Sequence, residues 1–178
     1  MRKISILSLL FLVTSFLQAQ EINWMSMNEA LEAQEKEPKK IFMDAYTTWC
    51  GPCKMLDRNT FSNKDVIQYV NENYYAVKFN AEGDEEINFQ DKKFTNPNFD
   101  PNKKGRNTMH QFTAALGVRG YPTLVFFDEE ANLIAPITGY RTPKQLEVYL
   151  KLFGTDDYKK MTTKKAFAEY QENFEGTF

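Results

Sequence analysis

Apolar and polar positions alternate along the chain in blocks that predict strands and helices in turn. Short apolar runs at residues 40–46 and 74–80 predict two buried strands. Apolar runs at residues 123–128 and 133–138 flank a polar turn and predict an antiparallel hairpin. Residues 22–25 fit a short edge strand. Strands separated by helical segments are typical of the α/β class.

The segments between these strands carry the start and stop signals of helices. Ser26 and Glu29 have the spacing of a capping box, and Pro38 ends the helix that they open. Thr142 and Gln145 have the same spacing ahead of a helix that we expect to reach about residue 153. Further helices are expected from Pro52, from Ser62, and at residues 108–116 and 163–174.

Residues 81–107 interrupt this alternation. They contain five Asn, two Pro and three Phe, with acidic residues at 82–86 and basic residues at 103–106. A stretch of this length without regular structure is unusual inside a domain and is often functional or mobile. Two interpretations stay open: a solvated insertion pinned by its phenylalanines, or a partner-binding lid near an active site.

The first nineteen residues have the pattern of a signal peptide. Arg2 and Lys3 form a basic head, and residues 4–17 are largely apolar and uncharged, which is short for a membrane span. We expect cleavage after Ala19 and no later membrane-spanning segment. The alternative is an uncleaved membrane anchor. Export would place the cysteines in an oxidising compartment.

Composition and charge exclude several classes of protein. A length of 178 residues favours a single main domain with a sizeable core, and a 42% apolar fraction is too high for a disordered chain. A formal charge of −2 lacks the basic excess typical of nucleic-acid binding. Two cysteines and one histidine cannot complete a His/Cys zinc tetrahedron, so we expect no metal site.

The candidate chemistry lies in Cys50 and Cys53, which follow a predicted strand and open a predicted helix. Free N–H groups and the helix dipole stabilise a thiolate at such a position, so the pKa of Cys50 should be lowered. Cys50 would then attack a disulfide, and the more shielded Cys53 would resolve the adduct. The alternatives are a structural disulfide, half a zinc site with His110, or a pair of inert thiols.

Two motifs of the chain resemble those of the thioredoxin family. Residues 49–54 read W-C-G-P-C-K, and residues 117–123 match the segment that carries the family's cis-proline. The resemblance extends over residues 22–153. The segment Thr60-Phe61-Ser62, together with Val66, resembles the corresponding segment in the soluble C-terminal domain of the periplasmic transmembrane reductant conductor. It also resembles exported thioredoxin-like proteins of Gram-negative bacteria.

This resemblance implies a three-layer α/β/α fold with a central mixed sheet. Its redox centre would be the Cys50–Cys53 disulfide, without a further cofactor. The chain departs from the family by an insertion before the cis-proline helix–strand unit and by a helical extension at its C-terminal end. The expected organisation is a signal peptide at residues 1–19, a thioredoxin-like domain at 20–154 that contains the insertion 81–107, and the extension at 155–178.

The resemblance also assigns a buried acid and a lysine to the catalytic group. Asp44 matches the acid behind the disulfide, and its apolar neighbours predict a raised pKa that suits a proton acceptor for Cys53. The alternative is a turn or capping aspartate. Lys78 matches the lysine that faces this acid from the neighbouring strand, and its alternative is an ordinary solvent-facing lysine.

The family match further predicts a substrate-binding surface beside Cys50. A cis peptide bond before Pro122 would present the preceding backbone to an extended substrate by strand addition. For Trp49 the alternative is simple packing, and for Gly139 it is an ordinary turn. The expected substrate-binding residues are Trp49, Gly51, Pro52, Tyr121, Pro122 and Gly139.

The direction of electron flow is inferred from the Gly-Pro pair between the cysteines, which resembles reducing members of the family. Reducing members have potentials of about −270 mV, and strong oxidants have potentials of about −120 mV. We expect a periplasmic reductase of protein disulfides, kept reduced by a membrane electron donor, in a Gram-negative bacterium. The alternatives are an oxidase or isomerase of oxidative folding, and a partner-binding module.

Overall fold

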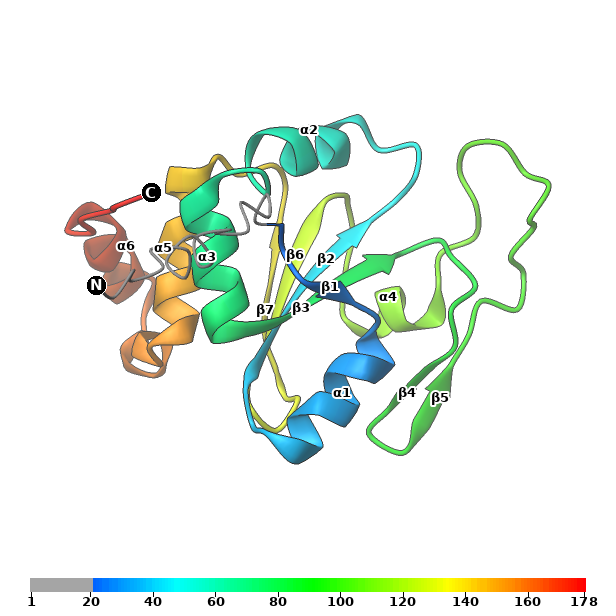
Figure 1. Ribbon diagram of the computed structural model, residues 1–178, viewed down its shortest axis with the longest axis horizontal. Helices are drawn as coiled ribbons and strands as arrows, with labels where there is room; N and C mark the ends of the chain where they lie inside the picture. Colours follow the sequence, from blue (N-terminus) through cyan, green and yellow to red (C-terminus); the bar gives the residue numbers. More distant parts are fainter. Residues whose placement is uncertain (1–20) are drawn as a thin grey trace, which may run out of the picture.

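A five-stranded mixed sheet with the order β1-β3-β2-β6-β7 forms the centre of the molecule (Figure 1). The structure is a computed structural model that describes residues 21–178, so the expected signal peptide lies outside the described residues. Parallel pairing joins β3 to β1 and to β2, whereas β6 pairs antiparallel with β2 and β7. The strands are β1 (Trp24–Met25), β2 (Lys40–Tyr46), β3 (Tyr74–Asn80), β6 (Thr123–Phe127) and β7 (Leu133–Thr138).

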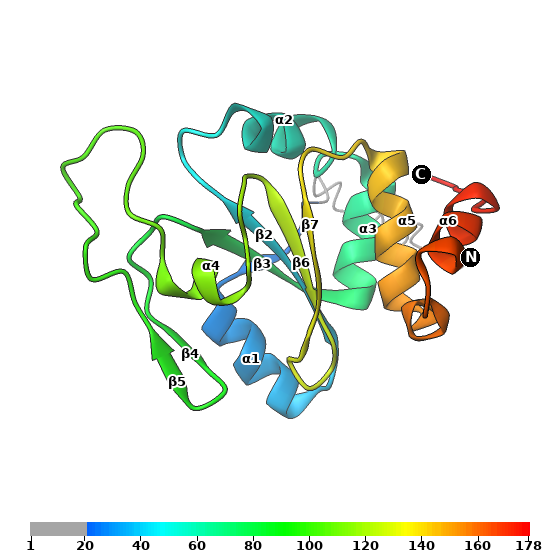
Figure 2. The same ribbon diagram turned by 180° about the vertical axis from the view of Figure 1, so that it is seen from behind.

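Helices cover both faces of this sheet, as the three-layer expectation requires. The α3 and α5 helices lie on one side of the sheet, and α1 and α4 lie on the other (Figures 1 and 2). Leu56 of α2 joins the core on the α3 and α5 side. The helices are α1 (Met27–Lys36), α2 (Gly51–Asn59), α3 (Lys64–Asn73), α4 (Gln111–Ala115) and α5 (Pro143–Gly154).

The apolar run of β2 is explained by burial on both faces of the strand. Phe42 packs toward α3 and α5 and meets Phe126 with 5.3 Å between ring centroids. Ile41 and Met43 point to the opposite face and join the core under α1 and α4. Successive side chains of a strand point to opposite faces, so a strand covered on both sides has no polar alternation. Lys40 begins the strand, and Asp44 is the charged residue in its middle.

Side-chain caps determine where the helices begin. The expected capping boxes are present at Ser26 before α1 and at Thr142 before α5. The α3 helix begins two residues later than expected, because the Asn63 side chain accepts the N–H groups of Asp65 and Val66. In the same way, His110 Nδ1 accepts the N–H of residue 112, and α4 begins only after this cap.

The insertion at residues 81–107 contains regular structure that the sequence did not predict. The β4 strand (Ile87–Phe89) and the β5 strand (Lys92–Phe94) form an antiparallel hairpin. Phe89 and Phe94 pack against Phe112 of α4, with ring centroids 5.2 and 5.4 Å apart. These contacts fasten the hairpin to the α1 and α4 side of the core.

The last residues of the chain fold back onto α5. A short 3₁₀ helix, η1 (Asp157–Lys160), leads to α6 (Lys164–Glu172). The fully buried carboxylate of Glu147 then accepts hydrogen bonds from the Thr177 N–H at 2.6 Å and from the Phe178 N–H at 3.1 Å. Lys151 lies 2.7 Å from the same carboxylate. Within residues 21–178, no helix combines the length and apolarity needed to cross a bilayer.

We predict that Glu147→Gln destabilises the protein by about 1–3 kcal/mol at neutral pH, because a donor would replace an acceptor of a buried, charge-assisted hydrogen bond. Burial raises the pKa of Glu147, but hydrogen bonds from Lys151, Thr177 and Phe178 outweigh it and leave the pKa lowered. Because its pKa is lowered, the charged carboxylate stabilises the fold at pH values above its ordinary pKa, and this contribution disappears as the pH falls. The destabilisation by Glu147→Gln should therefore shrink below about pH 4. Urea unfolding of the wild type and the variant, at neutral pH and below about pH 4, measures the difference in unfolding free energy.

Glu169→Gln is the matched control for this variant. Glu169 is exposed and lies 3.5 Å from Lys165, so its loss should change the unfolding free energy by less than about 0.5 kcal/mol. Equal destabilisation by the two variants would show that Glu147 does not hold the C-terminal segment.

Candidate active site

The two cysteines lie where β2 ends and α2 begins. Cys50 is the N-cap of α2, and its Sγ accepts the backbone N–H of Cys53 at 3.1 Å. Pro52 occupies the first turn of the helix, where its missing N–H leaves no helical hydrogen bond unmade. The first sulfur therefore lies at a helix N-terminus, which stabilises a negative charge on it when the bond is reduced.

Cys50 and Cys53 are joined by a disulfide, with 5.3 Å between their Cα atoms. We expected Cys53 to be the more shielded of the two. In this oxidised form both are buried, at 2% and 1% exposure, because Cys50 Sγ is bonded inward to the other sulfur. Gly51 and Pro52 are exposed and form the surface above the bond.

Asp44 is fully buried in the middle of β2. The alternative of a turn or capping aspartate is therefore wrong. Burial raises the pKa of Asp44 to about 6, although Lys78 opposes this shift from 2.7 Å away. Asp44 Oδ1 has no hydrogen-bond partner among the described residues. A carboxylate with this pKa and a free acceptor atom is suited to take up a proton near neutral pH.

Lys78 faces Asp44 across the β2–β3 pair, so it is not an ordinary solvent-facing lysine. Burial lowers the pKa of Lys78, but the Asp44 and Asp57 carboxylates outweigh it and leave the pKa raised. Its ammonium group also lies 5.0 Å from the centroid of the Trp24 ring. Lys78 is therefore a fixed positive charge beneath α2.

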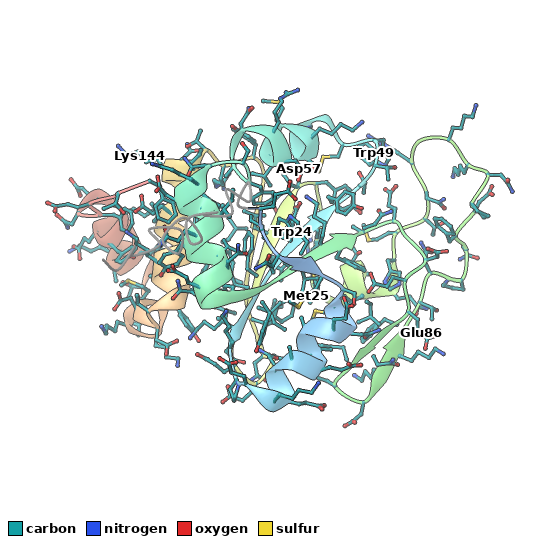
Figure 3. All side chains as sticks on the ribbon, viewed as in Figure 1. Trp24, Met25, Trp49, Asp57, Glu86 and Lys144 are labelled. Carbon is teal, nitrogen blue, oxygen red and sulfur yellow. A yellow bond between two sulfur atoms is a disulfide. The ribbon has the colours of Figure 1, made fainter. Side chains whose placement is uncertain are left out.

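Asp57 is a residue of this charged group that the sequence reasoning missed. It lies on α2 and accepts a hydrogen bond from Lys78 Nζ, so Lys78 bridges two carboxylates. Figure 3 labels Asp57 beneath α2 and Trp24 on β1. The signal was present in the sequence, since Asp57 follows Cys53 by four residues and shares its helix face.

The Tyr121–Pro122 peptide bond is cis, as the sequence motif predicted. Thr123 follows it and pairs with Ala45 of β2, so the bond lies at the sheet edge where β2 leads to Cys50. The Tyr121 ring meets the Trp49 ring edge-on at 5.9 Å. These pairings bring the cis-proline loop and the cysteine loop together.

Gly139 closes the same edge from β7. Its N–H donates to the carbonyl of Pro122 at 2.8 Å, and its φ of 99° lies in the left-handed region that favours glycine. Gly139 is thus a turn residue that holds the cis-proline loop. Its expected role in the approach of substrate backbone stays a prediction.

Trp49 is half-buried and is held by the insertion. Its ring N–H donates to Glu82 Oε2 at 2.7 Å, and the Arg106 guanidinium lies 4.4 Å from its ring centroid. Figure 3 labels Trp49 at the connection between β2 and α2. Sequence reasoning missed both contacts, because Glu82 and Arg106 lie far from Trp49 in the sequence and leave no local pattern.

The first interpretation of the insertion, as a segment pinned by its phenylalanines, agrees with the packing of Phe89 and Phe94 on Phe112. The contacts of Trp49 place the insertion beside the cysteines, but its action as a partner-binding lid stays a prediction.

A metal site finds no support in the described part of the chain. No group of three or more His, Cys, Asp or Glu side chains comes together within residues 21–178. His110 is fully buried, and its ring nitrogens bond to the Phe112 N–H and to the Glu85 carbonyl. Both nitrogens are occupied, so His110 is not free to join the cysteines as a zinc ligand.

Comparison with known proteins agrees with this geometry. A family model for the thioredoxin-like domain matches residues 27–154. The thiol:disulfide interchange protein DsbD of Pectobacterium atrosepticum is 26% identical over 133 residues, which are 74% of this chain and 19% of DsbD. The chain thus spans about a fifth of the length of that relative.

Two solved structures have the same fold. A thioredoxin-fold protein from Helicobacter pylori has a TM-score of 0.60 at 18% identity, over 84% of each chain. A candidate disulphide-isomerase from Bacteroides thetaiotaomicron has a TM-score of 0.52 at 29% identity, over 78% of this chain and 97% of that one. The chain therefore belongs to the thioredoxin-like family of thiol–disulfide oxidoreductases, with Cys50 and Cys53 as its Cys-X-X-Cys pair.

Proposed function

We propose that the protein is an exported reductase of protein disulfides. The observation that carries this proposal is the placement of Cys50 at the N-terminus of α2, above a strand that buries Asp44. One end of the cysteine pair is thereby favoured as a thiolate, and the other lies on a helix that covers a proton acceptor. A structural disulfide would need neither feature.

The reaction begins from the reduced protein. The Cys50 thiolate attacks one sulfur of a substrate disulfide, and the other substrate sulfur leaves as a thiolate. Cys53 then loses its proton to Asp44 and attacks Cys50 Sγ, which releases the second substrate thiolate. The protein ends with the Cys50–Cys53 disulfide seen in this structure, and the substrate has gained two electrons.

The substrate-binding surface consists of the exposed Gly51-Pro52 turn and the cis-proline loop beside it. Trp49 and Tyr121 supply an aromatic wall, since their rings are in contact. Pro122 cannot donate a backbone hydrogen bond, so an extended substrate would pair with the backbone of residue 121. Gly139 supports this loop through its hydrogen bond to Pro122. Lys78 acts through Asp44, whose charged form it stabilises.

The reducing direction and the location are inferred from the sequence and its relatives. The Gly51-Pro52 pair favours a reductase, and the relative DsbD is named for thiol:disulfide interchange. We therefore infer that the protein acts in the periplasm and that a membrane electron donor reduces its disulfide back to the dithiol. We also infer the domain division from the sequence: a signal peptide at 1–19, the thioredoxin-like domain at 20–154 and the C-terminal extension at 155–178.

Disulfide isomerisation is the second candidate function. It is favoured by the similarity to the Bacteroides thetaiotaomicron protein, described as a candidate disulphide-isomerase. Isomerisation uses the same attack by Cys50 but lets a substrate thiol, rather than Cys53, resolve the mixed disulfide. The two functions therefore differ in reduction potential and in their dependence on Cys53.

Replacing the resolving cysteine should trap substrates. We predict that Cys53→Ala accumulates mixed disulfides through Cys50, because the second attack cannot take place. Non-reducing electrophoresis followed by mass spectrometry of extracts from the exporting cells detects them. Cys50→Ala is the control and should accumulate none, and equal trapping by both variants would contradict the assigned order of attack.

The reduction potential decides the direction of electron flow. We predict a value of about −270 mV, as in reducing family members, because the Gly-Pro pair adds no positive charge beside the thiolate. Equilibration with glutathione buffers, read from the ratio of dithiol to disulfide, measures it. A value above about −180 mV would favour the isomerase or oxidase instead.

The pH dependence of resolution tests Asp44. With a pKa of about 6, Asp44 is protonated below that pH and accepts a proton above it, so the wild-type rate should rise through pH 6. The rate should then level off above pH 6. Asp44→Asn should lack this plateau, because the Cys53 proton must go to hydroxide instead, and should be slower at neutral pH by on the order of 100-fold. Stopped-flow measurement of mixed-disulfide resolution between pH 5 and 8 shows both effects.

Asp57→Asn is the matched control for the pH profile. Asp57 raises the pKa of Asp44 through charge repulsion, so its removal should keep the rise and move it to lower pH. An unchanged profile in Asp44→Asn would show that another group accepts the proton of Cys53.

A further inference from the structure

The insertion begins beside the active site because of the sheet register. Ala81 follows β3 directly, and its N–H donates to the carbonyl of Tyr46 at 2.8 Å. Tyr46 is the last residue of β2, from which the chain continues to Cys50. The parallel pairing of β2 and β3 thus delivers the insertion to the edge of the sheet that carries the disulfide.

Glu82 fixes the far end of the insertion at this same edge. Its Oε2 accepts the ring N–H of Trp49 and the backbone N–H of Asn107, each at 2.7 Å. Glu82 is only 9% exposed, so both hydrogen bonds are largely shielded from water. One carboxylate therefore ties the active-site tryptophan to the end of the loop of residues 95–107. Arg106 adds a second contact over the Trp49 ring.

The loop of residues 95–107 is held in shape by its own side chains. Asn96 donates to the carbonyls of Gly83 and Thr108 and so joins the two ends of the loop. The Asn107 side chain exchanges two hydrogen bonds with the backbone of Asp100. Both views show the loop beside the β2–α2 connection (Figures 1 and 2). A loop with a fixed shape presents a binding surface without a large entropy cost of ordering.

The charge of this loop is opposite to that of the chain. Lys103, Lys104 and Arg106 are exposed, and the only acid of residues 95–107 is Asp100, so the loop carries +2 (3 − 1) on a chain of −2. Among the ion pairs of residues 21–178, none involves these three cations. Lys103 and Lys104 are therefore free to meet a charge from outside, whereas Arg106 lies over the Trp49 ring.

We propose that the loop of residues 95–107 is a docking surface for acidic segments of protein substrates, held beside the disulfide by Glu82. The proposal rests on the proposed function and names its substrate class: a protein disulfide with carboxylates nearby in the sequence. Lys103 and Lys104 attract the acidic segment, and Trp49 connects the loop to the reacting sulfur. Opposite charges on the loop and on the substrate raise the rate at which the two proteins meet productively.

The test compares two peptides with the same internal disulfide, one flanked by glutamates and one by glutamines. The reduced wild-type protein should reduce the acidic peptide with about tenfold higher kcat/KM at low ionic strength, and about 0.5 M salt should remove the difference. Lys103→Gln/Lys104→Gln should lose most of this preference. Its rate with the glutamine peptide should stay unchanged.

Lys92→Gln/Lys93→Gln is the matched control, because it removes the same charge from the β4–β5 hairpin of the same insertion. It should keep the preference for the acidic peptide. Wild-type protein without such a preference, or an equal effect of the two double variants, would overturn the docking proposal. Hydroxyethyl disulfide, a small neutral substrate, should be reduced equally by all three proteins. Failure of the wild type to reduce it would overturn the proposed function, and the docking proposal with it.

Variants of Glu82 provide a second, independent test of the docking proposal. Glu82→Ala removes the link between Trp49 and the loop, so it should lower the preference for the acidic peptide while leaving the reduction potential unchanged. Glu82→Gln keeps an acceptor oxygen and should retain most of the preference. A shift of the potential without loss of preference would show that Glu82 serves the disulfide rather than the loop, and would overturn its proposed role.

Discussion

The ion pair between Asp44 and Lys78 is the interaction on which the site depends. A carboxylate buried in the middle of a sheet is costly unless a partner stabilises its charge. Lys78 meets this need from the neighbouring strand, at 2.7 Å, and reaches Asp57 on α2 with the same ammonium group. The pair therefore keeps a titratable acid under the cysteine helix and also joins that helix to the sheet.

The topology of the sheet explains why the parts of the site lie together. Because β2 and β3 are parallel, the cysteine loop and the insertion leave the sheet at the same edge. Because β6 is antiparallel to β2, the cis-proline loop enters at that edge as well. Three segments distant in sequence thus meet around one disulfide, and each can change in length without disturbing the strands that position the others.

Features with a local pattern could be predicted from the sequence. The strands at 40–46 and 74–80 have the expected bounds, since both are short apolar runs, and the capping boxes identify the starts of α1 and α5. The family motif placed the cysteines and the cis bond. The β4–β5 hairpin was missed because each strand has three residues and its turn uses Gln90 and Asp91 at positive φ, without a glycine to mark it. The Trp49–Glu82 contact joins residues 33 positions apart and leaves no local pattern.

That single contact has a consequence for how such a protein can diverge. The carboxylate at position 82 has two donors, one from the cysteine loop and one from the end of the insertion. A change of Trp49 to a residue without a ring N–H would leave Glu82 shielded with one donor fewer, and shortening the insertion would do the same from the other side. Positions 49 and 82 are therefore coupled through their side chains, whereas position 107 contributes only its backbone N–H. A chimaera that takes the insertion from a relative should take that relative's residue 49 with it.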